Sequence, residues 1–118
     1  MTPPPHDYVI GFIHAAQQDV ASLDGSIRKR LKKVLTGKLA VDPESYGTPL
    51  RGSLVGYWKH EFASHRIIYR IYADQRLVLI CAVGKRQGEH VSDVYRQLEA
   101  VVKAGDIARQ IQAILKKL

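Results

Sequence analysis

Residues 57–83 decide the fold of this chain, because the run YWKHEFASHRIIYRIYADQRLVLICAV contains three strand patterns in succession. Tyr57–Phe62 is the first, Arg66–Tyr72 is rich in β-branched and aromatic residues, and Arg76–Val83 is almost wholly apolar. The short polar connections between them predict antiparallel hairpins. Because the third strand is so apolar, we expect it to lie at the centre of a sheet and to be covered on both faces.

A fourth strand is predicted before this region. Apolar residues alternate over Tyr8–Ile13, which is typical of a strand. From His14 the spacing becomes helical, with Ala15, Ala16, Val20 and Leu23 on one face, and Asp24-Gly25 ends that helix.

A second helix follows at once, with Ser26 as the expected N-cap. It ends at Asp42-Pro43 and is joined to the first by a short turn, which predicts an αα-hairpin. Residues 44–49 are expected to form a loop. The apolar stripe of the second helix consists of Ile27, Leu31, Val34, Leu35 and Leu39.

The C-terminal segment is helical in pattern after Gly88, with an interruption at Gly105-Asp106 that predicts two consecutive helices or one kinked helix. The three prolines of residues 3–5 predict an extended or disordered tail over residues 1–6. The chain is therefore expected to be one α+β domain, with helices packed on a small sheet of about four strands, mostly antiparallel.

Composition limits the function classes. The chain has 118 residues, one cysteine and no apolar run near the length that spans a bilayer. These features exclude a disulfide framework and a multi-thiolate zinc site, and we expect a cytoplasmic protein without a membrane segment. The formal charge of +7 predicts an anionic partner, either a nucleic acid or an acidic protein.

The strand faces indicate where charged side chains gather. Alternation turns Trp58, His60 and Phe62 toward the core, and turns Lys59 and Glu61 to the other side. In the next strand Ile67, Tyr69 and Ile71 form the better core set, so Arg66 and Arg70 are expected beside Lys59 and Glu61. A core histidine with one satisfied ring nitrogen is the simpler interpretation of His60, and cross-strand salt bridging is the simpler one of Glu61.

The third strand leads into Gly84-Lys85-Arg86, a pair of cations that suits phosphate contact, although solvated basic turns are common. The sequence has no phosphate-binding glycine loop and no metal-binding motif. Metal ligands and a cofactor are therefore not expected, and no metal-ligand spacing links the five histidines, His6, His14, His60, His65 and His90.

Taken together, these motifs resemble the RelE/ParE toxin family. The resemblance covers residues 7–96 and leaves 97–118 as a helical extension packed on the same domain. It is carried by Leu50-Arg51-Gly52, the Arg66–Tyr69 motif, Gly84-Lys85-Arg86, the Ser26–Leu31 helix and the Asp42-Pro43 loop.

The resemblance implies a toxin of a bacterial type II toxin–antitoxin pair, neutralised by a cognate antitoxin that wraps it. In the RelE branch, the toxin cuts messenger RNA on the ribosome without a metal: the 2′-hydroxyl attacks the adjacent phosphate, and the 5′-oxygen leaves. Such a reaction needs a base, an acid and cations on the phosphate oxygens.

Carried over residue by residue, the resemblance implies that Arg66 and Arg86 bind the phosphate and that Lys59 is a basic strand position. It also places Tyr95 where a tyrosine stacks on a base or moves a proton, and His90 is the alternative for acid–base work. Glu61 stands where the RelE branch usually carries a basic residue, and a carboxylate there repels a phosphate unless it is the general base. The expected RNA-binding cations are Arg51, Arg70, Lys85, Lys29 and Lys33.

Two other functions stay open. A ParE-type toxin inhibits DNA gyrase by binding it and needs no catalytic residues, and Glu61 together with the C-terminal extension favours this alternative slightly. A catalytically inactive homologue is the third possibility.

Overall fold

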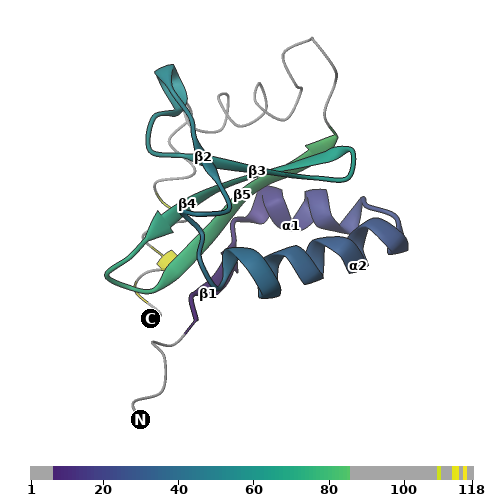
Figure 1. The fold of residues 1–118 in the computed structure, drawn as a ribbon, viewed down its shortest axis with the longest axis horizontal. Coiled ribbons are helices and arrows are strands. Elements are labelled where there is room, and N and C mark those ends of the chain that lie inside the picture. The colour runs from purple at the N-terminus through teal and green to yellow at the C-terminus, as the bar shows by residue number, and fades with distance from the viewer. Residues whose placement is uncertain (1–6, 86–108, 110–112, 115, 117–118) are drawn as a thin grey trace.

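The computed structural model describes residues 7–85 and, further along the chain, Arg109, Ala113, Ile114 and Lys116. Within this part of the chain, α1 and α2 cover one face of a twisted sheet (Figure 1). The predicted tail over residues 1–6, the boundary at residue 96 and the helical pattern of 97–118 lie outside the described residues, apart from single positions. One of these positions, Ile114, packs against the core.

The sheet has the strand order β1-β5-β4-β3-β2, and β1 runs parallel to β5 while the other neighbours are antiparallel. The predicted α+β class, the two hairpins and the position of the apolar strand between two others are confirmed. The strands are β1 Val9–Phe12, β2 Thr48–Pro49, β3 Trp58–Phe62, β4 His65–Tyr72 and β5 Leu77–Lys85.

The sheet has one strand more than the four predicted. This additional strand, β2, lies in the stretch that the sequence predicts to be loop. Thr48 pairs with Lys59 and Pro49 pairs with Trp58, so the strand contributes only these two residues. Because proline has no N–H to donate, it is tolerated at the edge of a sheet, where β2 lies. A pairing this short leaves no alternation in the sequence from which it could be predicted.

The two helices are α1, His14–Ala21, and α2, Gly25–Val34. The predicted N-cap of the second helix is wrong: Asp24, not Ser26, has the extended backbone of a cap, and its Oδ1 accepts a hydrogen bond of 2.9 Å from Ile27 N. Ser26 lies inside the first turn and donates its hydroxyl to the same Asp24 oxygen at 2.7 Å. A carboxylate at this end also stabilises the helix dipole.

The α-helix α2 ends at Val34, earlier than predicted. A π-helical turn, η1, follows it over Leu35–Leu39. The predicted apolar stripe nevertheless faces the core, because Leu31, Val34, Leu35 and Leu39 are buried and Ile27 packs against them.

Tyr69 of β4 fixes the loop between η1 and β2. Its side chain is fully buried, and its hydroxyl donates a hydrogen bond of 2.7 Å to the carbonyl of Pro43. Gly47 lies so close to this ring that a Cβ there would overlap the Tyr69 hydroxyl. The backbone of the loop at Gly47 therefore packs directly against the side chain of Tyr69, with no room for a methyl group at residue 47.

The register of β4 against β5 shifts between Ile68 and Tyr69, where Ile68 pairs with Ala82 and Tyr69 with Ile80. Cys81 is passed over, as in a β-bulge. The core predicted for β4 needs correction: Ile68, assigned to the face of Arg66, is fully buried, whereas Ile71 is only half-buried. Ile67 and Ile68 point to opposite faces and are both fully buried, so this part of β4 is buried on both faces.

Candidate functional site

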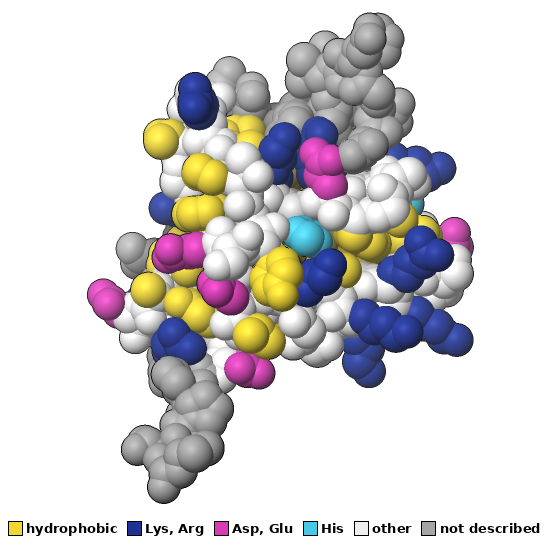
Figure 2. All heavy atoms as spheres, in the orientation of Figure 1, with side chains coloured by type: hydrophobic (Ala, Val, Ile, Leu, Met, Phe, Trp, Pro, Cys, Tyr) yellow, Lys and Arg dark blue, Asp and Glu magenta, His cyan; other side chains and the backbone are white. Residues whose placement is uncertain are grey.

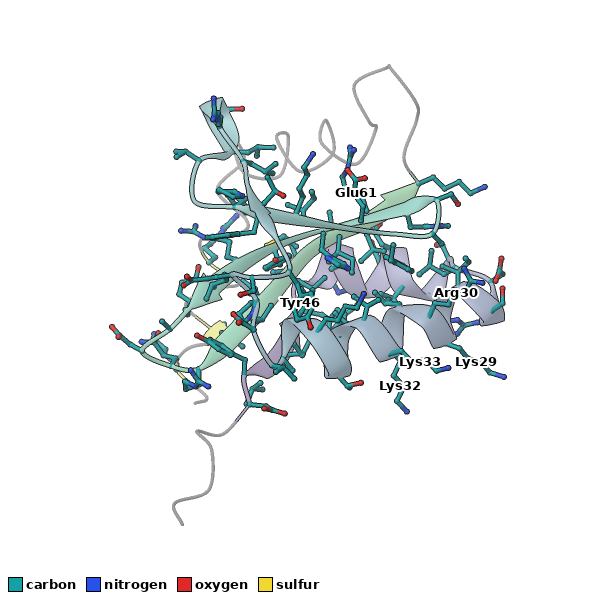
Figure 3. All side chains as sticks on the ribbon, viewed as in Figure 1. Lys29, Arg30, Lys32, Lys33, Tyr46 and Glu61 are labelled. Carbon is teal, nitrogen blue, oxygen red and sulfur yellow. The ribbon has the colours of Figure 1, made fainter. Side chains whose placement is uncertain are left out.

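Lys59, Glu61 and Arg66 form a charged cluster on the sheet face opposite the helices. Glu61 and Arg66 are direct cross-strand partners of β3 and β4, so their side chains emerge on the same side. Arg66 Nη2 donates a hydrogen bond of 3.1 Å to Glu61 Oε1, and Lys59 Nζ lies 3.6 Å from the same oxygen. Figure 3 shows Glu61 pointing away from α2. The predicted position of Arg66 beside Lys59 and Glu61 is therefore confirmed, whereas Arg70, predicted at the same place, is not part of this cluster.

The cluster is partly desolvated. The side chain of Arg66 is 15% exposed, while those of Lys59 and Glu61 are 30% and 33% exposed. Two cations against one carboxylate leave a net positive charge, which favours an anion, while the carboxylate orients both cations. Glu61 is the group in this cluster that can accept a proton, and Lys59 and Arg66 can stabilise negative charge on phosphate oxygens.

Arg70 lies further along β4 and is held by two tyrosines. Its guanidinium carbon is 5.0 Å from the ring centre of Tyr57 and 5.5 Å from that of Tyr72, both cation–π distances. Gly56 has a φ of +93°, and a Cβ at this position would lie 3.6 Å from Arg70 Nη2. The sequence analysis does not predict these two contacts. Strand alternation nevertheless places Tyr57 on the face of Lys59 and Tyr72 on the face of Arg70.

The end of β5 is positioned by Asp19 of α1, which sequence reasoning also missed. The β1–β5 ladder ends at Ile80, and beyond it Val83 N donates a hydrogen bond of 3.0 Å to Asp19 Oδ2. Burial raises the pKa of the Asp19 carboxyl, and the hydrogen bond from Val83 opposes that shift. Asp19 thus holds the strand just before Gly84, which lies opposite Arg66.

The basic turn after β5 is described only in part. Lys85 is exposed and pairs with His65, so its side chain emerges on the helix-covered side, unlike that of Arg66. Burial, and secondly the charge of Lys85, lowers the pKa of the buried His65. The other predicted catalytic residues, Arg86, His90 and Tyr95, lie outside the described residues.

The remaining predicted RNA-binding cations are dispersed. Lys29 and Lys33 both lie on α2, on the helix-covered side of the sheet (Figure 3). Lys and Arg side chains gather over α2 in the space-filling view (Figure 2). Arg51 is exposed in the connection between β2 and β3, just before a short 3-10 turn. The structure therefore brings Lys59, Glu61 and Arg66 together and leaves Lys29 and Lys33 on the other side of the sheet.

His60 fits its simpler interpretation. On the helix-facing side of β3, its Nδ1 donates a hydrogen bond of 2.6 Å to the carbonyl of Tyr46, while Nε2 is buried without a partner among the described residues. Within the described ranges, no three His, Cys, Asp or Glu side chains are grouped as metal ligands would be. None of the helices described is long and apolar enough to cross a membrane.

Comparisons with known proteins agree with the fold described above. The family model described as "ParE toxin of type II toxin-antitoxin system, parDE" matches residues 11–89. Toxin RelG of Mycobacterium tuberculosis is 29% identical over 90 residues, which cover 76% of this chain and 98% of RelG.

Two solved structures are also similar. The toxin–antitoxin complex RelBE2 from Mycobacterium tuberculosis gives a TM-score of 0.66 at 28% identity, covering 69% of this chain and 93% of the matched chain. A free double mutant of the E. coli toxin RelE gives 0.62 at 28% identity, covering 82% and 97%. Since the family model spans more than half of the chain, the chain belongs to the RelE/ParE superfamily of toxins from type II toxin–antitoxin systems.

Proposed function

We propose that this toxin is an endoribonuclease that cuts messenger RNA on the ribosome, in the cytoplasm. The observation that carries the proposal is the cluster of Lys59, Glu61 and Arg66, in which a carboxylate able to accept a proton lies against two cations able to bind a phosphate. The similarity to toxin RelG and to the RelE structures supports the same branch of the superfamily.

In the proposed reaction, Glu61 takes the proton of the 2′-hydroxyl, and the freed oxygen attacks the adjacent phosphorus. Negative charge develops on the non-bridging phosphate oxygens, where Arg66 offers a guanidinium and Lys59 an ammonium group. The bond to the 5′-oxygen then breaks, and that oxygen needs a proton as it leaves. The products are a 2′,3′-cyclic phosphate and a free 5′-hydroxyl, so no bond is oxidised or reduced.

The other residues of the proposed site follow β5 in the sequence. The proposal assigns Arg86 to the phosphate, and Tyr95 or His90 to the proton that the leaving oxygen needs. Arg51, Arg70 and Lys85 would bind the RNA near the site, and Lys29 and Lys33 would contact RNA along α2. We further propose that a cognate antitoxin binds and neutralises the toxin, since RelBE2 is a toxin–antitoxin complex.

The test is cleavage of a translated messenger RNA in a purified translation system, read by primer extension. Wild-type protein should produce cuts in phase with the codons, and Arg66→Ala should lower the rate by about 10²–10³-fold. Lys32→Ala is the matched control, because Lys32 is an exposed cation of α2 and its loss changes the net charge equally. If the wild-type protein leaves every transcript on programmed ribosomes intact, the proposal is wrong.

Inhibition of DNA gyrase is the second candidate function, because the matching family model is that of ParE toxins. The ion pair between Glu61 and Arg66 favours it as well, since a paired guanidinium is less available to RNA. A supercoiling assay separates the two functions. Inhibition by both the wild-type protein and Arg66→Ala, without RNA cleavage, would support gyrase as the target.

A further inference from the structure

A second feature of the molecule lies on the helix side of the sheet, away from the Glu61 cluster. A shallow pocket of about 270 Å³ opens between the end of α2 and the turn that joins β3 to β4. We call it the α2–β3 pocket. Its lining residues are Arg30, Lys33, Val34, Lys38, Phe62 and Ala63.

The pocket combines an apolar floor with a cationic rim. Val34 and Phe62 are 9% and 8% exposed, so each shows a small apolar surface to the pocket. Arg30 and Lys33 are exposed cations one helical turn apart. Lys38, in the π-helical turn η1, also lines the pocket. Its ammonium group lies 5.7 Å from the ring centre of Tyr46.

The charge of this surface has one sign. Every ionisable side chain that lines the pocket is a cation. The α2 sequence, GSIRKRLKKV, contains no carboxylate at all, and places Lys29 and Lys33, and likewise Arg30 and Lys33, at helical neighbour spacings. Like charges at these spacings destabilise a helix, and an anionic partner would relieve that repulsion.

We propose that the α2–β3 pocket binds an acidic polypeptide segment. An aliphatic side chain of the segment lies on Val34 and Phe62, and flanking carboxylates pair with Arg30, Lys33 and Lys38. The proposal goes beyond the function proposed above, because it requires neither RNA cleavage nor contact with gyrase, and because it assigns Lys33, proposed above as an RNA contact, to a carboxylate of a polypeptide.

The lining favours a polypeptide over a single-stranded RNA. Proteins hold unpaired bases by stacking them on exposed aromatic rings. Phe62 supplies the aromatic ring of this pocket, but it is buried, and its ring centre lies 5.7 Å from that of His65. A small apolar floor of this kind suits an aliphatic side chain, which gains by leaving water, whereas a phosphate gains nothing from it.

Ala63 provides the sharpest test. It is exposed at the pocket wall and has a φ of +49°, a backbone conformation that Asn and Asp adopt more readily than Ala. Ala63→Asp and Ala63→Asn are therefore both expected to fold, and they differ in one charge at nearly equal size. Equal melting temperatures of the two variants would establish that this comparison is sound.

The probe is a fluorescein-labelled synthetic peptide with one leucine flanked on both sides by glutamates, and binding is read by fluorescence anisotropy. Wild type and Ala63→Asn should bind it alike, Ala63→Asp should bind about tenfold more weakly or worse, and a serine-for-leucine peptide should also bind more weakly. Lys33→Ser should weaken binding more than Lys29→Ser, because only Lys33 lines the pocket. Equal binding by the two Ala63 variants would overturn the proposal. So would a labelled oligouridylate that binds more tightly than the peptide and is released by Ala63→Asp.

Discussion

Glu61 and Arg66 face each other across the β3–β4 ladder, and the carboxylate accepts a hydrogen bond of 3.1 Å from the guanidinium. Their separation is set by the tight turn between the strands, in which Ala63 has a φ of +49°. A phosphate that approaches Arg66 must therefore share the guanidinium with Glu61 or displace it. The same contact leaves the carboxylate close to any ribose whose phosphate Arg66 holds.

Replacing the carboxylate separates binding from catalysis. Glu61→Gln removes a charge that repels phosphate, so RNA should bind more tightly and KM on programmed ribosomes should fall. It also removes the proposed base, so kcat should fall by about 10²–10⁴-fold. Glu44→Gln, at an exposed carboxylate of the loop before β2, is the charge-matched control. An unchanged or raised kcat in Glu61→Gln would exclude Glu61 as the base.

Asp19 should contribute to stability through its hydrogen bond rather than its charge. Asp19→Ala leaves the Val83 N–H without its acceptor and should lower the free energy of unfolding by about 1–3 kcal/mol. Asp19→Asn keeps an oxygen acceptor and removes the partly buried charge, so at pH 7 it should be at least as stable as the wild type.

The pH dependence follows from the sign of the shift. Because burial raises the pKa of Asp19 above its ordinary 3.8, the folded state binds this proton more readily than the unfolded state. Above the pKa of Asp19 in the folded state, its buried charge lowers the free energy of unfolding. This loss fades as the pH falls toward the pKa of Asp19 in the unfolded state. Urea titrations should therefore show the advantage of Asp19→Asn at pH 7 shrinking in acid. An advantage that grows in acid would contradict this account.

The strands could be predicted because their patterns are long and regular. Alternation placed Trp58, His60 and Phe62 on one face and Lys59 and Glu61 on the other, and the register between β3 and β4 confirms that Glu61 meets Arg66. Alternation fails where the register shifts beside Cys81, since a bulge changes which residues share a face without leaving a mark in the sequence.

Features that depend on distant partners could not be predicted from the sequence. Asp19 was assigned only to a helix, yet it binds Val83, far along the chain. Arg70 is predicted as an RNA-binding cation, but the sequence does not show that Tyr57 and Tyr72 lie against its guanidinium. Each of these contacts joins elements whose relative positions are set by packing, and local propensity carries no information about them.

The packing of Gly47 against Tyr69 gives a coupled pair of substitutions. A Cβ at Gly47 would overlap the Tyr69 hydroxyl and lie 3.1 Å from the carbonyl oxygen of Pro43, so Gly47→Ala should lower the free energy of unfolding by about 1–3 kcal/mol. Tyr69→Phe loses the hydrogen bond to Pro43 but also removes the clashing oxygen. The double variant should therefore lose less stability than the sum of the two single variants, as measured by urea unfolding. Strict additivity would show that the methyl group at residue 47 and the Tyr69 hydroxyl do not meet.

His65 should make the stability of the fold depend on pH near neutrality. It is buried beside Phe62 at the end of the β3–β4 hairpin; its pKa is lowered first by burial and then by the charge of Lys85, while Asp24 opposes the shift. The unfolded chain therefore binds this proton more readily than the folded one, with an unfolded pKa of 6.5.

Above that value His65 is neutral in both the folded and the unfolded state, so its titration does not lower the free energy of unfolding. As the pH falls below 6.5 toward the folded pKa, the free energy of unfolding should decline. His65→Leu removes the titrating group and should flatten this part of the profile between about pH 8 and pH 5, whatever its effect on absolute stability. His14→Leu, at an exposed histidine of α1, is the matched control and should keep the wild-type slope. A slope that survives in His65→Leu would assign the pH dependence to another group.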